Sequence, residues 1–133
     1  MTKTTKKVIG FIFDENLEHV LLGQYKTGLN GISTKVKRDE MPLTAMQRVT
    51  SEKINNPPPW WHHYATLVGD NHIEYYYYGV VRNPSSNPET GITLVNPDYL
   101  STDKKLRWLI PIAKWVITKN HFPLMIMDQI YEE

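Results

Sequence analysis

Positions 49, 52 and 53, near the end of a predicted helix, decide whether that helix face attracts a cation or an anion. Positions 49, 52 and 53 are spaced i, i+3 and i+4, so they share one face of the helix. Three carboxylates on such a face would form an all-oxygen site for Mg²⁺ or Mn²⁺. This chain has Val49, Glu52 and Lys53 there, so a single carboxylate lies beside an ammonium group. An ammonium attracts a phosphate oxygen about 4 Å away by roughly 1 to 4 kcal/mol near a surface, so this face favours an anion.

The composition excludes several other kinds of site. The sequence has no cysteine, which rules out disulfides, zinc–thiolate sites, iron–sulfur clusters and a thiol nucleophile. With 15 basic and 14 acidic residues the formal net charge is +1, so there is no strong signal for nucleic acid or a membrane surface. Glycine-rich phosphate loops and the G-x-S-x-G nucleophile motif are also missing from the sequence.

Histidine and aromatic residues allow two further interpretations. His62 and His63 would point to opposite faces of a strand, so a metal ion shared between them and His72 would need a bulge. The aromatic residues could stack on a nucleobase. On alternating strands, however, half of the tyrosines would face one side of the sheet and half the other, which favours packing in the core or an interface. These aromatic residues are Trp60, Trp61 and Tyr75–Tyr78.

Hydrophobic periodicity predicts one clear helix with a block of strands on either side of it. The helix spans Asp39–Asn56, and Pro42 suits its first turn. A second helix is expected near Leu106–Ile117, and a short closing helix over Phe122–Tyr131. Strands are predicted over Val8–Phe13, His19–Tyr25, Ile32–Lys37, Trp61–Val68, His72–Val81 and Ile92–Val95, with a loop over Lys26–Gly31.

The order of these elements argues for a mixed β-sheet between helices, because the strands come in hairpins. We therefore expect an α/β fold with a single domain over residues 8–133, preceded by a flexible polar tail over residues 1–7. The apolar runs are too short to span a bilayer, and no signal-peptide core is found. We expect no membrane segment and a cytoplasmic location.

The segment Asn30–Asn55 carries the most specific pattern in the chain. It reads NGISTKVKRDEMPLTAMQRVTSEKIN and resembles the loop–helix signature of the Nudix family, Gly-x5-Glu-x7-Arg-Glu-apolar-x-Glu-Glu-x-Gly. Glu40 falls on the first glutamate, Arg48 on the arginine and Glu52 on the first of the last two glutamates. The similarity extends beyond the signature to Val8–Phe13, Val20–Gly23, Pro59–Leu67 and Leu106–Pro111.

The chain departs from this signature at positions that matter for metal binding. In the family these glutamates hold a divalent cation against a diphosphate. Here Val49 and Lys53 replace two of the last three glutamates, and Lys37 replaces a frequent one in the loop. The three replacements change the local charge by about +5. Glycines of the signature are replaced as well, the opening pair by Ser33-Thr34 and two others by Asp39 and Asn55.

The resemblance implies a Nudix-type α/β/α sandwich with a mixed β-sheet and a nucleotide or nucleoside-diphosphate derivative as ligand. Because most metal-holding glutamates are replaced, we expect recognition of this ligand with phosphoanhydride hydrolysis weak or lost. The candidate catalytic residues are Glu52, Arg48 and Glu40, of which Glu52 and Glu40 would hold Mg²⁺ or Mn²⁺ if the protein is active. The candidate nucleotide- and phosphate-binding residues are Asn30, Lys35, Lys37 and Lys53, together with Arg48.

Other interpretations of the same residues stay open. One is an active, divergent hydrolase of nucleoside di- or triphosphate derivatives, with further carboxylates supplied from outside the helix. Another is a protein-interaction module with a vestigial pocket, and many members of the family are dimers, so a homodimer is one expected form. The outside carboxylates would be Asp70, Glu74 or Glu89.

Each candidate residue also has a purely structural interpretation. Glu40 could be a carboxylate favoured by the helix dipole, and Glu52 could be the i,i+4 partner of Arg48. Val49 could be a core residue and Asn30 a turn residue in left-handed geometry. In the same way, Lys37 and Lys53 could be solvated surface charges.

Overall fold

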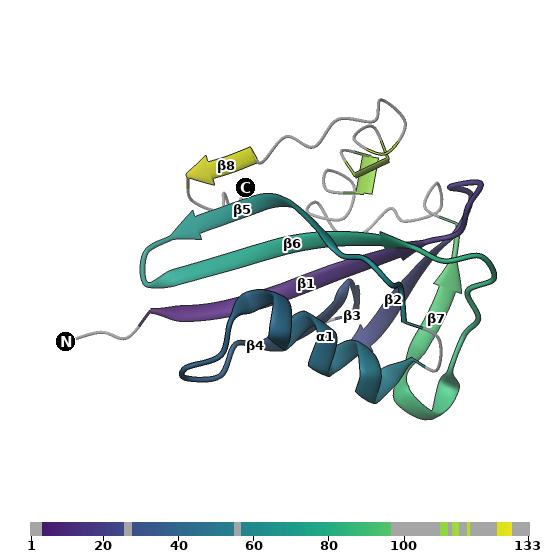
Figure 1. The fold of residues 1–133 in the computed structure, drawn as a ribbon, viewed down its shortest axis with the longest axis horizontal. Helices are drawn as coiled ribbons and strands as arrows, with labels where there is room; N and C mark the ends of the chain where they lie inside the picture. Colours follow the sequence, from purple (N-terminus) through teal and green to yellow (C-terminus); the bar gives the residue numbers. More distant parts are fainter. Residues whose placement is uncertain are drawn as a thin grey trace.

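The computed structural model describes residues 4–25, 28–54, 57–96, 110, 111, 113, 114, 117 and 125–128. These residues form an eight-stranded mixed sheet with helix α1 (Pro42–Lys53) against one face (Figure 1). The strand order is β3-β2-β1-β6-β5-β8, while β4 also pairs with β1 and β7 with β2. The strands are β1 (Thr5–Phe13), β2 (Val20–Tyr25), β3 (Gly28–Asn30), β4 (Ile32–Lys35), β5 (His62–Gly69), β6 (His72–Val80), β7 (Ile92–Val95) and β8 (Met125–Asp128), with a 3₁₀ helix, η1 (Pro88–Thr90), before β7.

Strands β1 and β6 form the centre of the sheet. They pair in parallel along their whole length, from Thr5 beside His72 to Phe13 beside Val80. Strand β6 is also the second strand of an antiparallel hairpin with β5, which turns at Asp70 and Asn71. Because β2 and β4 pair with β1 in the antiparallel sense, the sheet is mixed, as the hairpin order predicted.

Helix α1 covers one face because its buried side chains recur at helical spacing. Ala45, Met46, Val49 and Thr50 are buried and pack on apolar residues of β1, β2 and β4. Gly10 allows the helix to come close, because an added Cβ would lie 2.6 Å from Met46 Cε. The helix ends at Lys53, since the next residue is extended (φ −131°). It is therefore shorter at both ends than predicted, although Pro42 opens it as expected.

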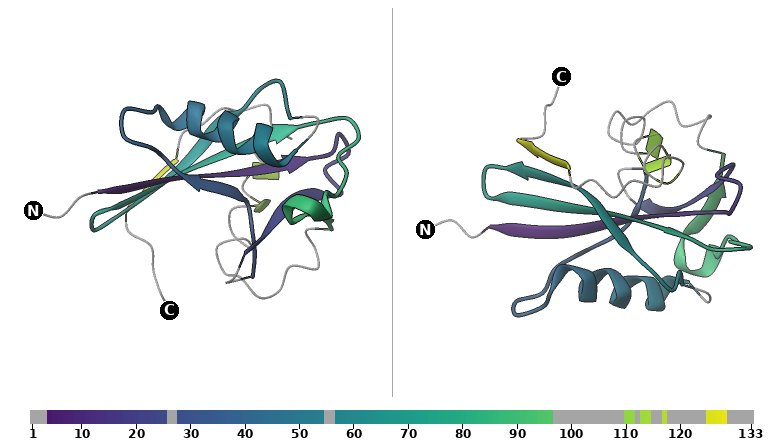
Figure 2. Two further views of the ribbon diagram at one scale, coloured as in Figure 1. Left: turned by 90° about the horizontal axis from the view of Figure 1, so that it is seen from below. Right: turned by 45° about the horizontal axis from the view of Figure 1, so that its top comes forward.

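The opposite face carries a second core with its own helical residues. Ile110 and Ala113 are helical and pack with Phe11 and Tyr76 on that face. The sheet thus has a helical layer on each side (Figure 2). The rest of the predicted second helix lies outside the described residues. Within the part of the chain that the structure describes, every helix is too short or too polar to cross a membrane.

The run of tyrosines in β6 alternates between the two cores, as the strand period predicted. Tyr76 and Tyr78 belong to the core on the second face, whereas Tyr77 lies on the α1 face with Tyr75 packed beside it. The paired histidines follow the same rule. His62 stacks on the ring of Tyr78 at 5.0 Å between centroids, and His63 lies 5.1 Å from that of Tyr77.

Three expectations about the elements are wrong. Residues 5–7 belong to β1 rather than to a flexible tail, because their backbones pair with β6. Residues 28–30 of the predicted loop form the short strand β3 against β2. In place of a closing helix over Phe122–Tyr131, residues 125–128 form β8, parallel to β5. A short apolar run has no decisive period, so an available sheet edge can determine its structure.

Candidate functional site

Arg48 connects helix α1 to the loop between β4 and α1. Its Nε donates to Glu40 Oε2 at 2.9 Å, and its Nη2 donates to Glu40 Oε1 at 3.1 Å. The same Nη2 donates to the carbonyl of Lys35 at 3.1 Å, and the backbone N–H of Lys37 donates to Glu40 Oε1 at 2.9 Å. This two-pronged ion pair fixes the loop against the helix.

The Glu40 carboxylate is held in its charged form by these contacts. Hydrogen bonds from Arg48 and from the backbone of Lys37 lower its pKa to about 2. The same ion pair raises the pKa of Arg48. Glu40 precedes α1 and lies outside its first turn, and the side chain of Arg48, from within the helix, balances its charge.

Glu52 extends this network along α1. Its Oε1 lies 3.6 Å from Arg48 Nη1 in an i,i+4 ion pair, which confirms the pairing that the spacing predicted. The side chain of Glu52 is 61% exposed, whereas that of Glu40 is 11% exposed. The three predicted catalytic residues are thus brought together, with Glu52 as the accessible carboxylate among them.

Val49 and Lys53 each make a packing contact. Val49 is 4% exposed and packs in the core with Val8 and Ile12, so its interpretation as a core residue is confirmed. Lys53 is partly exposed, and its Nζ lies 5.0 Å from the centroid of the Tyr25 ring. This cation–π contact fixes the ammonium group at the end of α1 that is nearest β2.

The other predicted binding residues make contacts that involve the backbone of the β3–α1 segment. Lys35 and Lys37 are exposed, and their main-chain groups take part in the Arg48 network. Asn30 lies in β3, where its Oδ1 accepts the backbone N–H of Gly31 at 2.7 Å. Among the described non-glycine residues, positive φ occurs at Leu17, Asp39 and Asn71, so the left-handed interpretation of Asn30 is wrong.

The residues of α1 do not fit a divalent cation held by several carboxylates. Val49 has no oxygen ligand, Lys53 carries a positive charge, and Glu40 is occupied by Arg48. Over the described ranges, no group of three or more His, Asp or Glu side chains is placed to bind a metal ion. Glu52 is therefore the one accessible carboxylate among these residues.

The carboxylates considered outside the helix lie elsewhere. Glu74 is buried on the face opposite α1, where Tyr76 donates to its Oε1 at 2.8 Å and His72 Nε2 lies 3.1 Å from its Oε2. Asp70 is exposed in the β5–β6 turn, and Glu89 is exposed in η1.

Tyr25 is the residue of this site that the sequence did not reveal. It contacts Lys53 from the end of β2, just before the signature segment Asn30–Asn55, and its hydroxyl oxygen accepts the backbone N–H of Ser33 at 2.9 Å. Gly23 is the one local feature of the sequence that is related to the position of the Tyr25 ring, because an added Cβ there would lie 2.7 Å from the ring.

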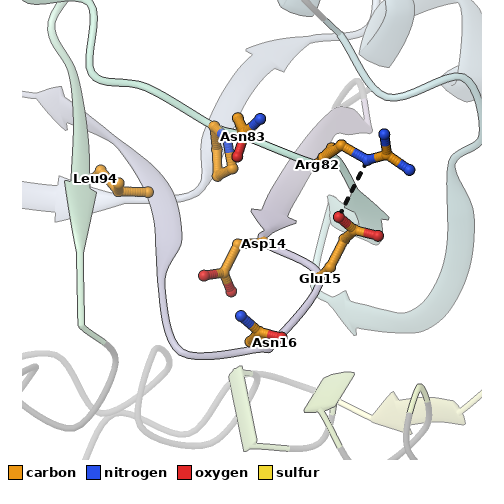
Figure 3. A pocket seen from close by; sticks show the side chains of 7 residues that line it. Asp14, Glu15, Asn16, Arg82, Asn83 and Leu94 are labelled. Carbon is orange, nitrogen blue, oxygen red and sulfur yellow. Dashed lines mark ion pairs between the residues drawn. The ribbon is translucent and has the colours of Figure 1, made fainter.

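One hollow lies away from this cluster, and a second borders it at Arg48. A polar cleft of about 410 Å³ opens between the β1–β2 turn and the loop after β6, where Arg82 Nε lies 3.4 Å from Glu15 Oε1 (Figure 3). It is lined by Asp14, Glu15, Asn16, Arg82, Asn83, Pro84 and Leu94. A groove of about 500 Å³ runs between α1 and the segment before β5, and its lining includes Arg48, Gln47, Pro58 and Trp61.

Solved structures with a similar fold include three bacterial proteins. MutT, from work on Aliivibrio salmonicida and Vibrio cholerae, is 17% identical with a TM-score of 0.65 and covers 86% of this chain and 96% of its own. The Nudix domain of Shewanella oneidensis NrtR, complexed with ADP-ribose, is 14% identical with a TM-score of 0.69 and covers 88% and 90%. A Nudix hydrolase from Nitrosomonas europaea is 14% identical with a TM-score of 0.66 and covers 97% and 81%.

These similarities show that the chain has the Nudix fold, an α/β/α sandwich built on a mixed sheet. No family model matches the sequence, and no curated protein matches it. At 14–18% identity the relationship extends to the fold, whereas the ligand and the chemistry must be argued from this chain's own residues.

Proposed function

We propose that the protein recognises a nucleotide or nucleoside-diphosphate derivative and that its metal-dependent phosphoanhydride hydrolysis is weak or lost. The observation that carries this proposal is the composition of the α1 face. Val49 is in the core, Lys53 contacts the Tyr25 ring, and Glu40 is ion-paired with Arg48. On that face, Glu52 is the one accessible carboxylate that could act as a ligand for a metal ion.

The class of ligand is supported by the fold and by the local charges. A protein of the same fold, the NrtR Nudix domain, was solved with ADP-ribose, which contains a diphosphate. In this chain Lys35 is exposed at the end of β4 and Lys37 in the loop before α1, and Lys53 is partly exposed at the end of α1. Ammonium groups at these positions provide charge-assisted donors for phosphate oxygens.

Calorimetry with and without metal tests the proposal. ADP-ribose, ADP and ATP are titrated into the protein in EDTA and, separately, in MgCl₂, and the ligand is recovered after denaturation for chromatography. We expect at least one nucleotide to bind in EDTA and to be recovered intact after incubation with Mg²⁺. Rapid metal-dependent cleavage would instead favour a divergent hydrolase, and the absence of any nucleotide binding would favour an interaction module.

Charge variants show whether the proposed lysines carry the binding. Lys37→Ala should weaken the affinity for the phosphorylated ligand in a manner that depends on salt concentration. Lys114→Ala is the matched control. This lysine is also partly exposed, but it follows Ala113, which packs on the side of the sheet away from α1. Equal losses in both variants would contradict a local anion site.

A further inference from the structure

Tyr25 is anchored from three sides at the end of β2. The hydroxyl-bearing edge of its ring passes close to Gly23, where a Cβ would be only 2.7 Å from the ring. Its hydroxyl oxygen accepts the N–H of Ser33 in β4 at 2.9 Å, and Lys53 Nζ lies 5.0 Å from its ring centroid. Strand β2, strand β4 and helix α1 therefore meet at this one side chain.

The direction of the Ser33 hydrogen bond determines how the phenol can act. Because the Tyr25 oxygen accepts from Ser33 N–H, its own hydrogen is directed elsewhere and can be donated. The Lys53 ammonium group, which lies over the Tyr25 ring, is a second donor and has three N–H groups. A hydroxyl donor and a tethered cation in one place form a complementary pair for an oxyanion.

We infer that Tyr25 and Lys53 together form a phosphate subsite in which the ammonium takes the place of a divalent cation. Tyr25 acts as a positioning residue for Lys53 and donates its hydroxyl hydrogen to a phosphate oxygen. This inference rests on the proposed function. It specifies which residues contact the diphosphate and how they contact it. The ligand chemistry is an inorganic or nucleotide-borne diphosphate bound without metal.

A purely structural role for Lys53 makes different predictions. A lysine in the last turn of a helix also offsets the helix dipole, and Lys53 is the basic residue of the last turn of α1. In that case its replacement would lower stability without changing affinity for a phosphate probe, and Tyr25 would have no influence on binding.

The test combines a spectroscopic readout with binding of inorganic pyrophosphate in EDTA. In the wild type, the Lys53 side-chain methylene next to Nζ should show an upfield ring-current shift in the NMR spectrum. Tyr25→Phe keeps the ring and should keep this shift, whereas Tyr25→Leu should lose it. Gly23→Ala retains both donors and should alter the shift by displacing the ring.

Pyrophosphate affinity should follow the same order. We expect Tyr25→Leu and Lys53→Met to weaken binding by about tenfold or more, and Tyr25→Phe by less because it loses only the hydroxyl. Lys114→Met should bind like the wild type. Thermal unfolding of each variant verifies that it is folded at the temperature of the titration.

The outcomes separate this inference from the proposed function. If nucleotides bind in EDTA but Tyr25→Leu retains both the Lys53 shift and the pyrophosphate affinity, the subsite is overturned and the proposed function stands. If the wild type binds neither nucleotides nor pyrophosphate, both are overturned. Loss of affinity in Tyr25→Leu together with loss of the Lys53 shift supports the subsite.

Discussion

At residue 39 the backbone takes a left-handed conformation, with φ of 67°, in the loop between β4 and α1. Glycine would adopt this positive φ without the steric cost that a Cβ brings. Aspartate tolerates this region better than most residues, which is consistent with its presence here.

Asp39→Gly should stabilise the protein. Removing the Cβ relieves the steric strain of the left-handed conformation. The greater flexibility of glycine in the unfolded chain offsets part of this effect. We therefore expect the free energy of unfolding to rise by about 0.5–1 kcal/mol. Thermal unfolding measures it as a higher Tm. Arg38→Gly is the control, because Arg38 is not among the residues with positive φ and should lose stability. A lower Tm for Asp39→Gly would show that the aspartate side chain stabilises the loop.

Introducing carboxylates at positions 49 and 53 should lower the free energy of unfolding and raise the affinity for a divalent metal ion. Val49 is 4% exposed in the core, so Val49→Glu with Lys53→Glu should cost about 2–4 kcal/mol in the absence of metal. Mn²⁺ should then raise the Tm of the double variant but not that of the parent. Calorimetry with Mn²⁺ provides the direct measurement. Equal metal affinities in the two proteins would contradict the assigned helix face.

Contacts between residues close together on one helix could be predicted, whereas contacts across the fold could not. The Arg48–Glu52 pair and the burial of Val49 follow from helical spacing. The ion pair between Arg48 and Glu40 depends on how the loop folds back, and the contact of Lys53 with Tyr25 depends on the packing of α1 beside β2. Neither is encoded in a local period.

At the scale of elements, the β4–α1 loop depends on the charge state of Glu40. Its folded-state pKa of about 2 lies below the ordinary value of 4.5, so the carboxylate favours the folded state above pH 4.5. This stabilisation is lost as the pH falls through 4.5 toward 2. Glu40→Gln should therefore unfold at lower urea concentration than the wild type at pH 7, and the difference should shrink as the pH approaches 2.

Urea denaturation at several pH values, with an NMR titration of the Glu40 carboxyl, checks this expectation. Glu52→Gln is the control, because its ion pair is exposed and should contribute about 0.5 kcal/mol or less at pH 7. A difference between wild type and Glu40→Gln that stays constant down to pH 2 would contradict the role of the Arg48–Glu40 pair.

The segment before β5 docks closely on β6 at Gly79. A Cβ at this position would lie 2.7 Å from Pro58 Cγ and 3.2 Å from the backbone oxygen of Trp60, and neither group can move freely. Gly79→Ala should thus cost about 1–3 kcal/mol through overpacking. In Gly69→Ala the nearest atom is 3.8 Å away, so this control should be close to neutral in thermal unfolding. Equal stability of the two variants would show that residues 57–60 are not tightly packed.

Elements that carry their own periodicity were predictable, and those that depend on a partner were not. Helix α1, the β5–β6 hairpin and β7 lie close to where the pattern placed them, and β7 agrees at both ends. Strands β3 and β8 are short and pair at opposite ends of the strand order, so tertiary pairing decides their conformation.

For the whole molecule, the long parallel pair of β1 and β6 organises the sheet from the first residues of the chain. Thr5 N–H donates to the carbonyl of Asn71 at 2.9 Å, and Val36 N–H donates to that of Lys6 at 2.9 Å. The residues that the sequence assigned to a tail therefore join the β5–β6 hairpin and the segment after β4 to the central strand. Their side chains are exposed or partly exposed, so main-chain hydrogen bonds provide their contribution.

Two N-terminal deletions measure how much these residues stabilise the fold. Deleting residues 2–4 should leave the urea midpoint nearly unchanged, because the paired strand begins at Thr5. Deleting residues 2–7 also removes the pairing of Lys7 with Lys35 and of residues 5–7 with β6. At about 0.5–1.5 kcal/mol net for each hydrogen bond, with some recovery through solvent, we expect a loss of about 1–3 kcal/mol. Identical midpoints for the two deletions would mean that β1 is stabilised from Val8 onward and that the first strand residues are dispensable.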